Sequence, residues 1–215
     1  NFFTDISNFV AYELGQPTHC YDFEYVADGL TLTKVDRELK FKTLLGKEIV
    51  LEGENLVFKS LKDELVNLAG IMGSISSGTS NETRSVLIEC AYFAPESIIG
   101  KSIQYDINSE AAYRFERGVD FNLHEDALKE ALSIIREIYQ ADISNIETIK
   151  NKYFPKKNLI NISLEEVNLK LGTDLKENMI KSILNRLEIK LIKKNKNNLT
   201  FEAPSHRFDL SIKED

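Results

Sequence analysis

The sequence predicts an α+β chain in two parts: a mixed-sheet domain that contains one long helix, and then a small helix-helix-hairpin domain. Three observations predict it. Short apolar runs of strand length fill the first part, one long helical repeat ends it, and two helical segments precede two strand-like runs in the second. A length of 215 residues suits one large or two smaller cores. We expect the boundary within residues 142–155 and assign 1–150 and 151–215 to the two domains.

Strands of the first part are predicted from short apolar or alternating runs that Gly, Asn and Asp separate. These runs cover residues 30–35, 47–51, 56–59 and 86–90, and the opening residues 1–5 also read as strand. A glycine-serine segment, residues 70–78, leads toward the last run. Its spacing fits neither the phosphate-loop nor the dinucleotide motif. We interpret it as a loop whose backbone approaches another group closely.

The long helix is predicted over residues 123–139, with Asn122 as its N-cap. Apolar residues recur at helical spacing along it and predict one buried face. They are Ala127, Leu128, Ala131, Leu132, Ile135 and Ile138.

Four charges of alternating sign surround one Phe in residues 114–120, just before this helix. Arg pairs with carboxylates through a planar fork. We therefore expect Arg114, Glu116, Arg117 and Asp120 to form an ion-pair network that anchors the chain. Gly118 permits the backbone angle needed for the turn that closes it.

The second part begins with two helical segments. Residues 163–166, Ser-Leu-Glu-Glu, form a capping box, and Gly172 ends the helix that they start. Residues 174–177 open another helix. Two strands follow over residues 189–192 and 199–202, joined by a turn at 195–198. This order is typical of a winged-helix-like module, whose last element we expect to be cut short.

Charge is distributed unevenly within the net −7. Residues 1–147 hold 13 Lys and Arg against 25 Asp and Glu, whereas residues 148–215 hold 14 against 9. The first part is therefore not expected to bind nucleic acid through a broad positive field. The second part suits either weak nucleic-acid binding or a solvated lysine-rich surface. No apolar run approaches the roughly 20 residues that span a bilayer, so we expect no membrane association.

The two cysteines, Cys20 and Cys90, form no closely spaced ligand set, so the sequence predicts no metal site. The opening residues lack the basic and apolar regions of a signal peptide. Free thiols then suit a cytoplasmic protein. Because the chain starts without Met, we expect it to be a piece of a larger protein.

Several separated segments resemble one family in their order and spacing. They are residues 5–8, 13–22, 68–73, 81–83, 87–93 and 114–120. Together they are similar to the editing module of the bacterial phenylalanyl-tRNA synthetase beta subunit. Residues 155–215, which include Ala-Pro-Ser-His-Arg-Phe-Asp at 203–209, resemble the module that follows it there. The resemblance covers essentially the whole chain and implies that the N-terminal edge of the editing module is missing.

The resemblance implies an activity and partners. In that family the beta subunit joins an alpha subunit in an alpha2-beta2 heterotetramer that charges tRNA(Phe), with ATP and magnesium used in the alpha subunit. The editing module hydrolyses tyrosine wrongly attached to that tRNA. The segment seen here would therefore carry ester hydrolysis rather than aminoacylation, and it would need no cofactor of its own.

Glu89 is the predicted recognition residue. It lies in an apolar run, residues 85–93, where a carboxylate is either paired, with Arg114 or Arg117, or used in function. A site that selects Tyr over Phe needs a buried acceptor for the phenol, because Phe would leave that acceptor unpaired. The resemblance gives Glu89 this role and implies that the backbone amide of Gly73 reads the same hydroxyl.

The remaining site residues also come from the resemblance. His19 would position the ester or the attacking water, although a lone His is often structural. Ser7 and Asn8 would lie near the substrate amino group and the terminal adenosine; capping a turn is the alternative role. Ser109 and Ala111 would line the amino-acid pocket, where the small Ala111 leaves room for the tyrosyl ring.

The sequence departs mildly from the family pattern. Residues 109–112 read Ser-Glu-Ala-Ala where Thr-Asp-Ala-Ser is common. Ser7 stands where Thr is usual, and Ser74 follows Gly73 where a second Gly is common. These changes support an alternative, a non-catalytic structural and tRNA-positioning module. Cys20 is not expected to be a nucleophile, because adjacent side chains on a strand point apart.

Overall fold

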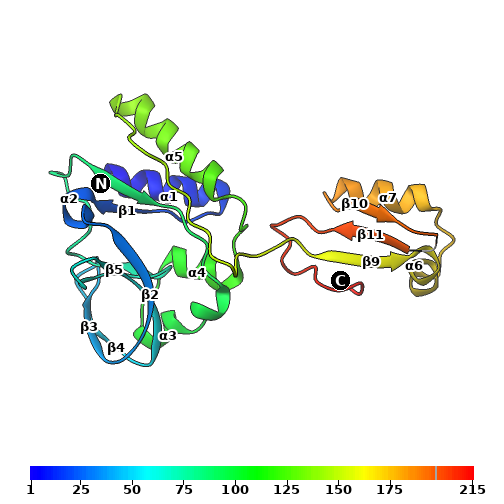
Figure 1. The fold of residues 1–215 in the computed structure, drawn as a ribbon, viewed down its shortest axis with the longest axis horizontal. Helices are drawn as coiled ribbons and strands as arrows, with labels where there is room; N and C mark the ends of the chain where they lie inside the picture. Colours follow the sequence, from blue (N-terminus) through cyan, green and yellow to red (C-terminus); the bar gives the residue numbers. More distant parts are fainter. Residues whose placement is uncertain (197) are drawn as a thin grey trace. The chain divides into compact units, whose positions relative to one another are not determined.

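The computed structural model describes residues 1–196 and 198–215, and its chain divides into two compact units (Figure 1). Unit 1 comprises Asn1–Val119 and Leu123–Asn145, and unit 2 comprises Asp120–Asn122 and Ile146–Asp215. Each unit contains both helices and antiparallel strands, which confirms the α+β class. None of the helices in the part of the chain that the structure describes is long and apolar enough to cross a membrane.

The chain opens with helix α1 (Phe2–Leu14), so the strand predicted there is wrong. The Asn1 side chain caps the helix by accepting a hydrogen bond from the Thr4 amide, and Gly15 ends it in the left-handed conformation. Ile6 and Val10, one turn apart, are buried against α5. These tertiary contacts, together with the cap, outweigh the weak strand preference of the first residues.

The long helix is α5 (His124–Tyr139), close to the predicted range. Its N-cap is Leu123 without a side-chain bond, so the prediction of Asn122 is wrong; the Asn122 amide instead donates to Asp120 Oδ1. The predicted buried face is confirmed at Ala127, Ala131 and Ile135, which pack against α1 (Figure 1). Ile138, in the last turn, is 58% exposed because the α1 core ends before it.

Unit 1 contains three sheets instead of one mixed sheet, and all their pairings are antiparallel. Short connections, which favour hairpin pairing, join most of their strands. The largest sheet has the order β2-β5-β6-β7, with β2 (Leu30–Asp36), β5 (Glu54–Ser60), β6 (Leu65–Leu68) and β7 (Met72–Gly73). The other two pair β3 (Leu39–Lys42) with β4 (Glu48–Leu51) and β1 (His19–Asp22) with β8 (Val86–Glu89).

Short helices complete unit 1. They are α2 (Phe23–Val26), a 3-10 turn (Pro95–Ser97), α3 (Lys101–Tyr105) and α4 (Glu110–Arg117). Phe93 and Phe115 belong to the main core, to which strands β2 to β6 and helices α3 and α4 contribute buried residues. Gly70 lies beside them, where an added Cβ would come within 2.8 Å of the Phe93 ring. The glycine-serine segment therefore does approach other groups closely.

Residues 114–120 do not form the predicted ion-pair network. Arg114 pairs with Glu110, one helical turn back in α4, and Arg117 lies over the Tyr113 ring at 3.6 Å. The i,i+4 geometry of a helix makes these neighbours closer than the residues of the segment itself. Gly118 ends the helix with φ +92, as the turn prediction requires.

Unit 2 has the order β9 (Leu159–Ser163), α6 (Leu164–Leu171), α7 (Glu177–Arg186), β10 (Lys190–Lys194), β11 (Asn198–Glu202). The capping box at Ser163 and the left-handed Gly172 are both confirmed. The second helix begins three residues later than predicted. Strand β9 was not predicted; it pairs with β11 and gives a three-stranded sheet. The predicted turn at 195–198 includes residue 197, which lies outside the described residues.

Candidate functional site

The two-stranded sheet of β1 and β8 brings the predicted catalytic residues together. In its antiparallel register the Cα of His19 lies opposite that of Glu89. Residues directly opposite each other project from the same face of a sheet. The register therefore places these two side chains side by side, although 69 residues separate them in the chain.

Tyr21 is the hydrogen-bond partner of Glu89. It shares the face of His19, being two residues along the same strand. Its hydroxyl donates to Glu89 Oε2 at 2.8 Å and accepts from Asn67 Nδ2 at 2.8 Å. The Tyr21 ring is fully buried and meets the His19 ring edge-on, with centroids 4.5 Å apart.

Gly73 lies directly against the imidazole of His19. A Cβ added to Gly73 would come within 2.5 Å of Cε1 and 2.8 Å of Nε2 of His19. The imidazole therefore occupies space that a side chain at residue 73 would fill. His19 Nε2 is buried and has no hydrogen-bond partner among the described residues.

Burial controls the electrostatics of this group. It raises the pKa of Glu89 to about 7, and the hydrogen bond from Tyr21 acts in the opposite direction. It lowers the pKa of His19 to about 4, so the imidazole is neutral at pH 7. A buried site thus contains an uncharged imidazole beside a carboxyl group that titrates near neutrality.

Neither of the arginines proposed as partners reaches Glu89. Arg114 pairs with Glu110, and Arg117 donates to the Tyr113 carbonyl. Within the described ranges, Glu89 forms no ion pair, and its only hydrogen bond is the one from Tyr21. Glu89 is therefore held by a neutral donor, which leaves its charge uncompensated.

The other four predicted residues differ in how they are connected to this group. The Ser7 hydroxyl bonds to Thr18, the residue before His19, through both its carbonyl and its hydroxyl oxygen. Ser109 caps α4 and donates to the carbonyl of Ile71 at 2.7 Å, two residues before Gly73. Asn8 is an exposed residue of α1. Ala111 packs at the edge of the main core.

The sequence interpretation missed Tyr21 and Asn67. Both carried a signal. Tyr21 is two residues from His19, so it shares its strand face, and Asn67 is a polar residue within the apolar run of β6. Buried polar residues in such runs need partners, which makes them candidates for a network.

The cysteines beside this group are poor nucleophiles. Burial, and secondarily the Glu89 charge, raises the pKa of Cys20 to about 12 and that of Cys90 to about 12. Both thiols are free, and the thiolate is the reactive form. Cys20 points to the carbonyl of Phe3, at 3.9 Å, which lies in α1.

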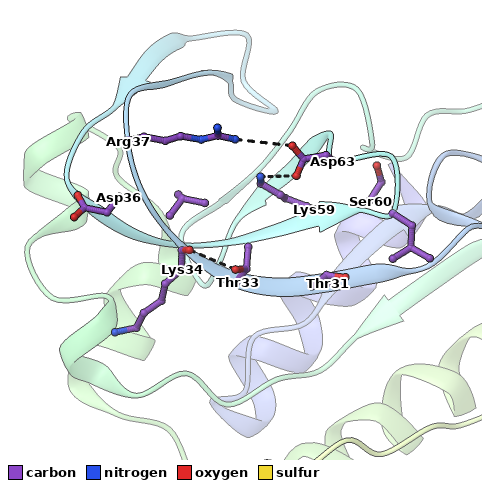
Figure 2. Close-up of a pocket in the computed structure, with 10 residues that line it drawn as sticks. Thr31, Thr33, Lys34, Asp36, Arg37, Lys59, Ser60 and Asp63 are labelled. Atoms are coloured by element: carbon purple, nitrogen blue, oxygen red, sulfur yellow. Dashed lines mark hydrogen bonds and ion pairs between the residues drawn. The ribbon is translucent and has the colours of Figure 1, made fainter.

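A separate hollow is lined by residues of the paired strands β2 and β5 and of the segments that follow them, and it shares no residue with the predicted site (Figure 2). Its volume is about 520 Å³. Asp63 faces two cations there, with Lys59 Nζ at 2.7 Å and an Arg37 nitrogen at 3.9 Å (Figure 2). The carboxylate neutralises much of their charge, so this hollow offers a mixed polar surface instead of a strong anion site.

Family comparison places both units. Residues 1–140 match the B3/4 domain, and residues 160–215 match the tRNA synthetase B5 domain. The first match covers more than half of the chain. The chain therefore belongs to the B3/4 domain family, with a B5 domain following in the same chain.

The similar proteins are phenylalanine–tRNA ligase beta subunits. That of Hahella chejuensis is 36% identical over 212 residues, which is 98% of this chain and 27% of the relative. That of Pseudomonas putida is 32% identical over 213 residues, again 98% and 27%. The chain thus spans about a quarter of the length of these relatives.

One solved structure is also similar. It is an N-terminal fragment of the phenylalanyl-tRNA synthetase beta subunit from Pyrococcus horikoshii, with a TM-score of 0.46 and 12% identity, over 97% of this chain and 61% of that one.

Proposed function

We propose that the first unit hydrolyses tyrosyl-tRNA(Phe), as the editing part of a phenylalanine–tRNA ligase beta subunit. The observation that carries the proposal is the buried group of Glu89, His19 and Gly73, which the fold brings together from three strands. The family match and the beta-subunit relatives support it.

Glu89 would recognise the tyrosine hydroxyl. Its carboxylate is a buried acceptor that pairs with no cation in the part of the chain that the structure describes. A tyrosyl phenol would donate to it, whereas a phenylalanyl ring would leave a buried charged group with an unmet hydrogen bond. Such an unmet bond costs roughly 1–3 kcal/mol, which corresponds to about five- to 150-fold discrimination, and it costs more for a charged group.

His19 would position the ester or the water. Its imidazole is neutral, and the ring nitrogen without a hydrogen can accept a hydrogen bond from a water molecule. In the reaction the water oxygen forms a bond to the ester carbonyl carbon, and the bond to the ribose oxygen breaks. The water's protons end on the products, tyrosine and tRNA. Orienting one water supplies much of the rate for a labile ester.

The other predicted residues complete the proposal. The Gly73 amide would read the same phenol, Ser7 and Asn8 would lie near the substrate amino group and terminal adenosine, and Ser109 and Ala111 would line the amino-acid pocket. The whole ligase would pair this beta subunit with an alpha subunit in an alpha2-beta2 heterotetramer. The alpha subunit would use ATP and magnesium, and tRNA(Phe) would be the shared partner.

Deacylation by the complete ligase tests the proposal. Glu89→Ala should slow the clearance of Tyr-tRNA(Phe) about tenfold or more, because the phenol loses a charged acceptor. Glu137→Ala, which removes an exposed carboxylate from α5, is the matched control and should change nothing. Unchanged clearance of Tyr-tRNA(Phe) in the Glu89 variant would refute the assignment.

A second candidate function is a structural and tRNA-positioning module without catalysis. The observation that favours it is the internal phenol of Tyr21, which already donates to Glu89. If that bond satisfies the carboxylate, no acceptor is left for a substrate. Titration with tyrosine, followed by amide NMR shifts around Glu89, separates the two. Saturable shifts with tyrosine and not with phenylalanine support recognition, and no shifts support the structural module.

A further inference from the structure

The hydrogen bond from Tyr21 engages one oxygen of Glu89 and leaves the other available. Oε2 accepts from the Tyr21 hydroxyl at 2.8 Å. Oε1 has no hydrogen-bond partner among the described residues, yet it is not one of the fully buried unpaired polar atoms. A carboxylate has acceptor sites on both oxygens. Glu89 therefore keeps an unpaired acceptor oxygen even with Tyr21 in place.

Tyr21 itself cannot turn away. Its ring is fully buried, and its edge-on contacts with His19 and Phe58 hold the ring plane. Its hydroxyl accepts from the buried Asn67 amide, which leaves the phenolic hydrogen to point at Glu89. The donor is thus fixed in both position and direction.

We propose that Tyr21 is a positioning residue of this site, which holds Oε2 of Glu89 so that Oε1 alone meets the phenolic hydroxyl of a bound tyrosyl group. The ligand role rests on the editing function proposed above. The hold of Tyr21 on the carboxylate rests on the geometry of β1, β6 and β8.

Tyr21 is the neighbour that stabilises the negative charge of Glu89. The titratable groups on the same sheet face as Glu89 are His19 and Tyr21 of β1; the thiols of Cys20 and Cys90, one residue out of phase, interact with its charge from the other face. His19 is neutral at pH 7, and burial keeps both thiols protonated. Asn67 of β6 carries no charge and acts through the phenol. Removing the Tyr21 hydroxyl should therefore make Glu89 harder to ionise.

Tyr21→Phe tests this role, because it removes the hydroxyl and keeps the ring. The pKa of Glu89, measured by carboxyl NMR titration of the whole chain, should rise above its wild-type value. In the complete ligase, the preference for hydrolysing Tyr-tRNA(Phe) over Phe-tRNA(Phe) should fall about three- to tenfold at pH 7 and recover at higher pH. Tyr25→Phe on the exposed α2 is the matched control and should alter neither measurement.

The outcomes separate the two proposals. An unmoved Glu89 pKa and an unmoved pH profile in Tyr21→Phe would overturn the positioning role, even if Glu89→Ala abolishes editing. If the wild-type ligase shows no preference for the tyrosyl ester, the editing function fails, while the NMR titration still decides whether Tyr21 holds the carboxylate. Should Tyr21→Phe fold poorly, Asn67→Leu, which frees the phenol from its donor, should move the pKa in the same direction by less.

Discussion

At the scale of single residues, the site depends on the Glu89 carboxyl group, which pairs with no cation among the described residues. Glu89 lies opposite His19, and within the same residues only the Tyr21 hydroxyl donates a hydrogen bond to it. Burial raises its pKa from the usual 4.5 of a glutamate to about 7. Between these values the unfolded chain gives up the proton more readily than the folded one, so stability falls as pH rises through that window. Above about pH 7 the cost is fully present.

Replacement of this carboxyl group should therefore stabilise the fold in a pH-dependent way. Glu89→Gln keeps the acceptor for Tyr21 and removes the charge. The free energy of unfolding should increase by on the order of 1–3 kcal/mol at pH 8 and by little at pH 5, where the wild-type carboxyl is already protonated. Urea denaturation at both pH values measures it. An equal effect at pH 5 and pH 8 would mean that ionisation of Glu89 is not the cause.

At the scale of elements, local sequence signals predicted the ends of helices well and the pairing of strands and charged residues poorly. Capping chemistry predicted the start and end of α6 at Ser163 and Gly172. Strand β9 was not predicted, because its short run of alternating residues becomes a strand through its pairing with β11. The predicted network of residues 114–120 failed because a helix carries Arg114 to Glu110. Both errors concern which residues lie next to each other in space. The sequence indicates this less well than it indicates the local backbone conformation.

The contact between Gly73 of β7 and His19 of β1 can be tested by mutation. In Gly73→Ala, the new Cβ would meet His19 Cε1 at 2.5 Å, so the imidazole must move. We expect a loss of about 1–3 kcal/mol in the free energy of unfolding, as for other overpacked sites. His19→Ala supplies the control through a double-mutant cycle measured by denaturation. The Gly73 penalty should largely vanish in the His19→Ala background, and purely additive effects would contradict the contact.

At the scale of the whole molecule, the chain consists of two units with opposite charge balance, which match two domain families. The net charge of −7 combines an acidic first part and a basic second part. Between α5 and β9, residues 140–158 contain no helix or strand and are mostly exposed. The lysines and Pro155 were the basis for predicting a domain boundary within residues 142–155, and the structure groups the three residues Asp120–Asn122 with unit 2.

Limited proteolysis should detect this segment first. Lys150 and Lys152 are exposed and outside regular structure, so trypsin should cut there before it cuts within the strands or helices. Mass spectrometry of the early products should show one fragment ending at Lys150 or Lys152 and its complement. First cleavage at Lys59, which is buried in β5, would contradict the described fold.

The sequence by itself determined the α+β class, the long helix, the caps of α6 and the unusual position of Glu89 in an apolar strand. These features depend on local periodicity and on capping residues, which neighbours in the chain decide. Only the tertiary structure decided what Glu89 meets: Tyr21 rather than an arginine, His19 across the β1–β8 pair, and Gly73 beneath the imidazole. The physical reason is that strand register and the approach of separate sheets depend on packing between distant segments, which no local pattern encodes.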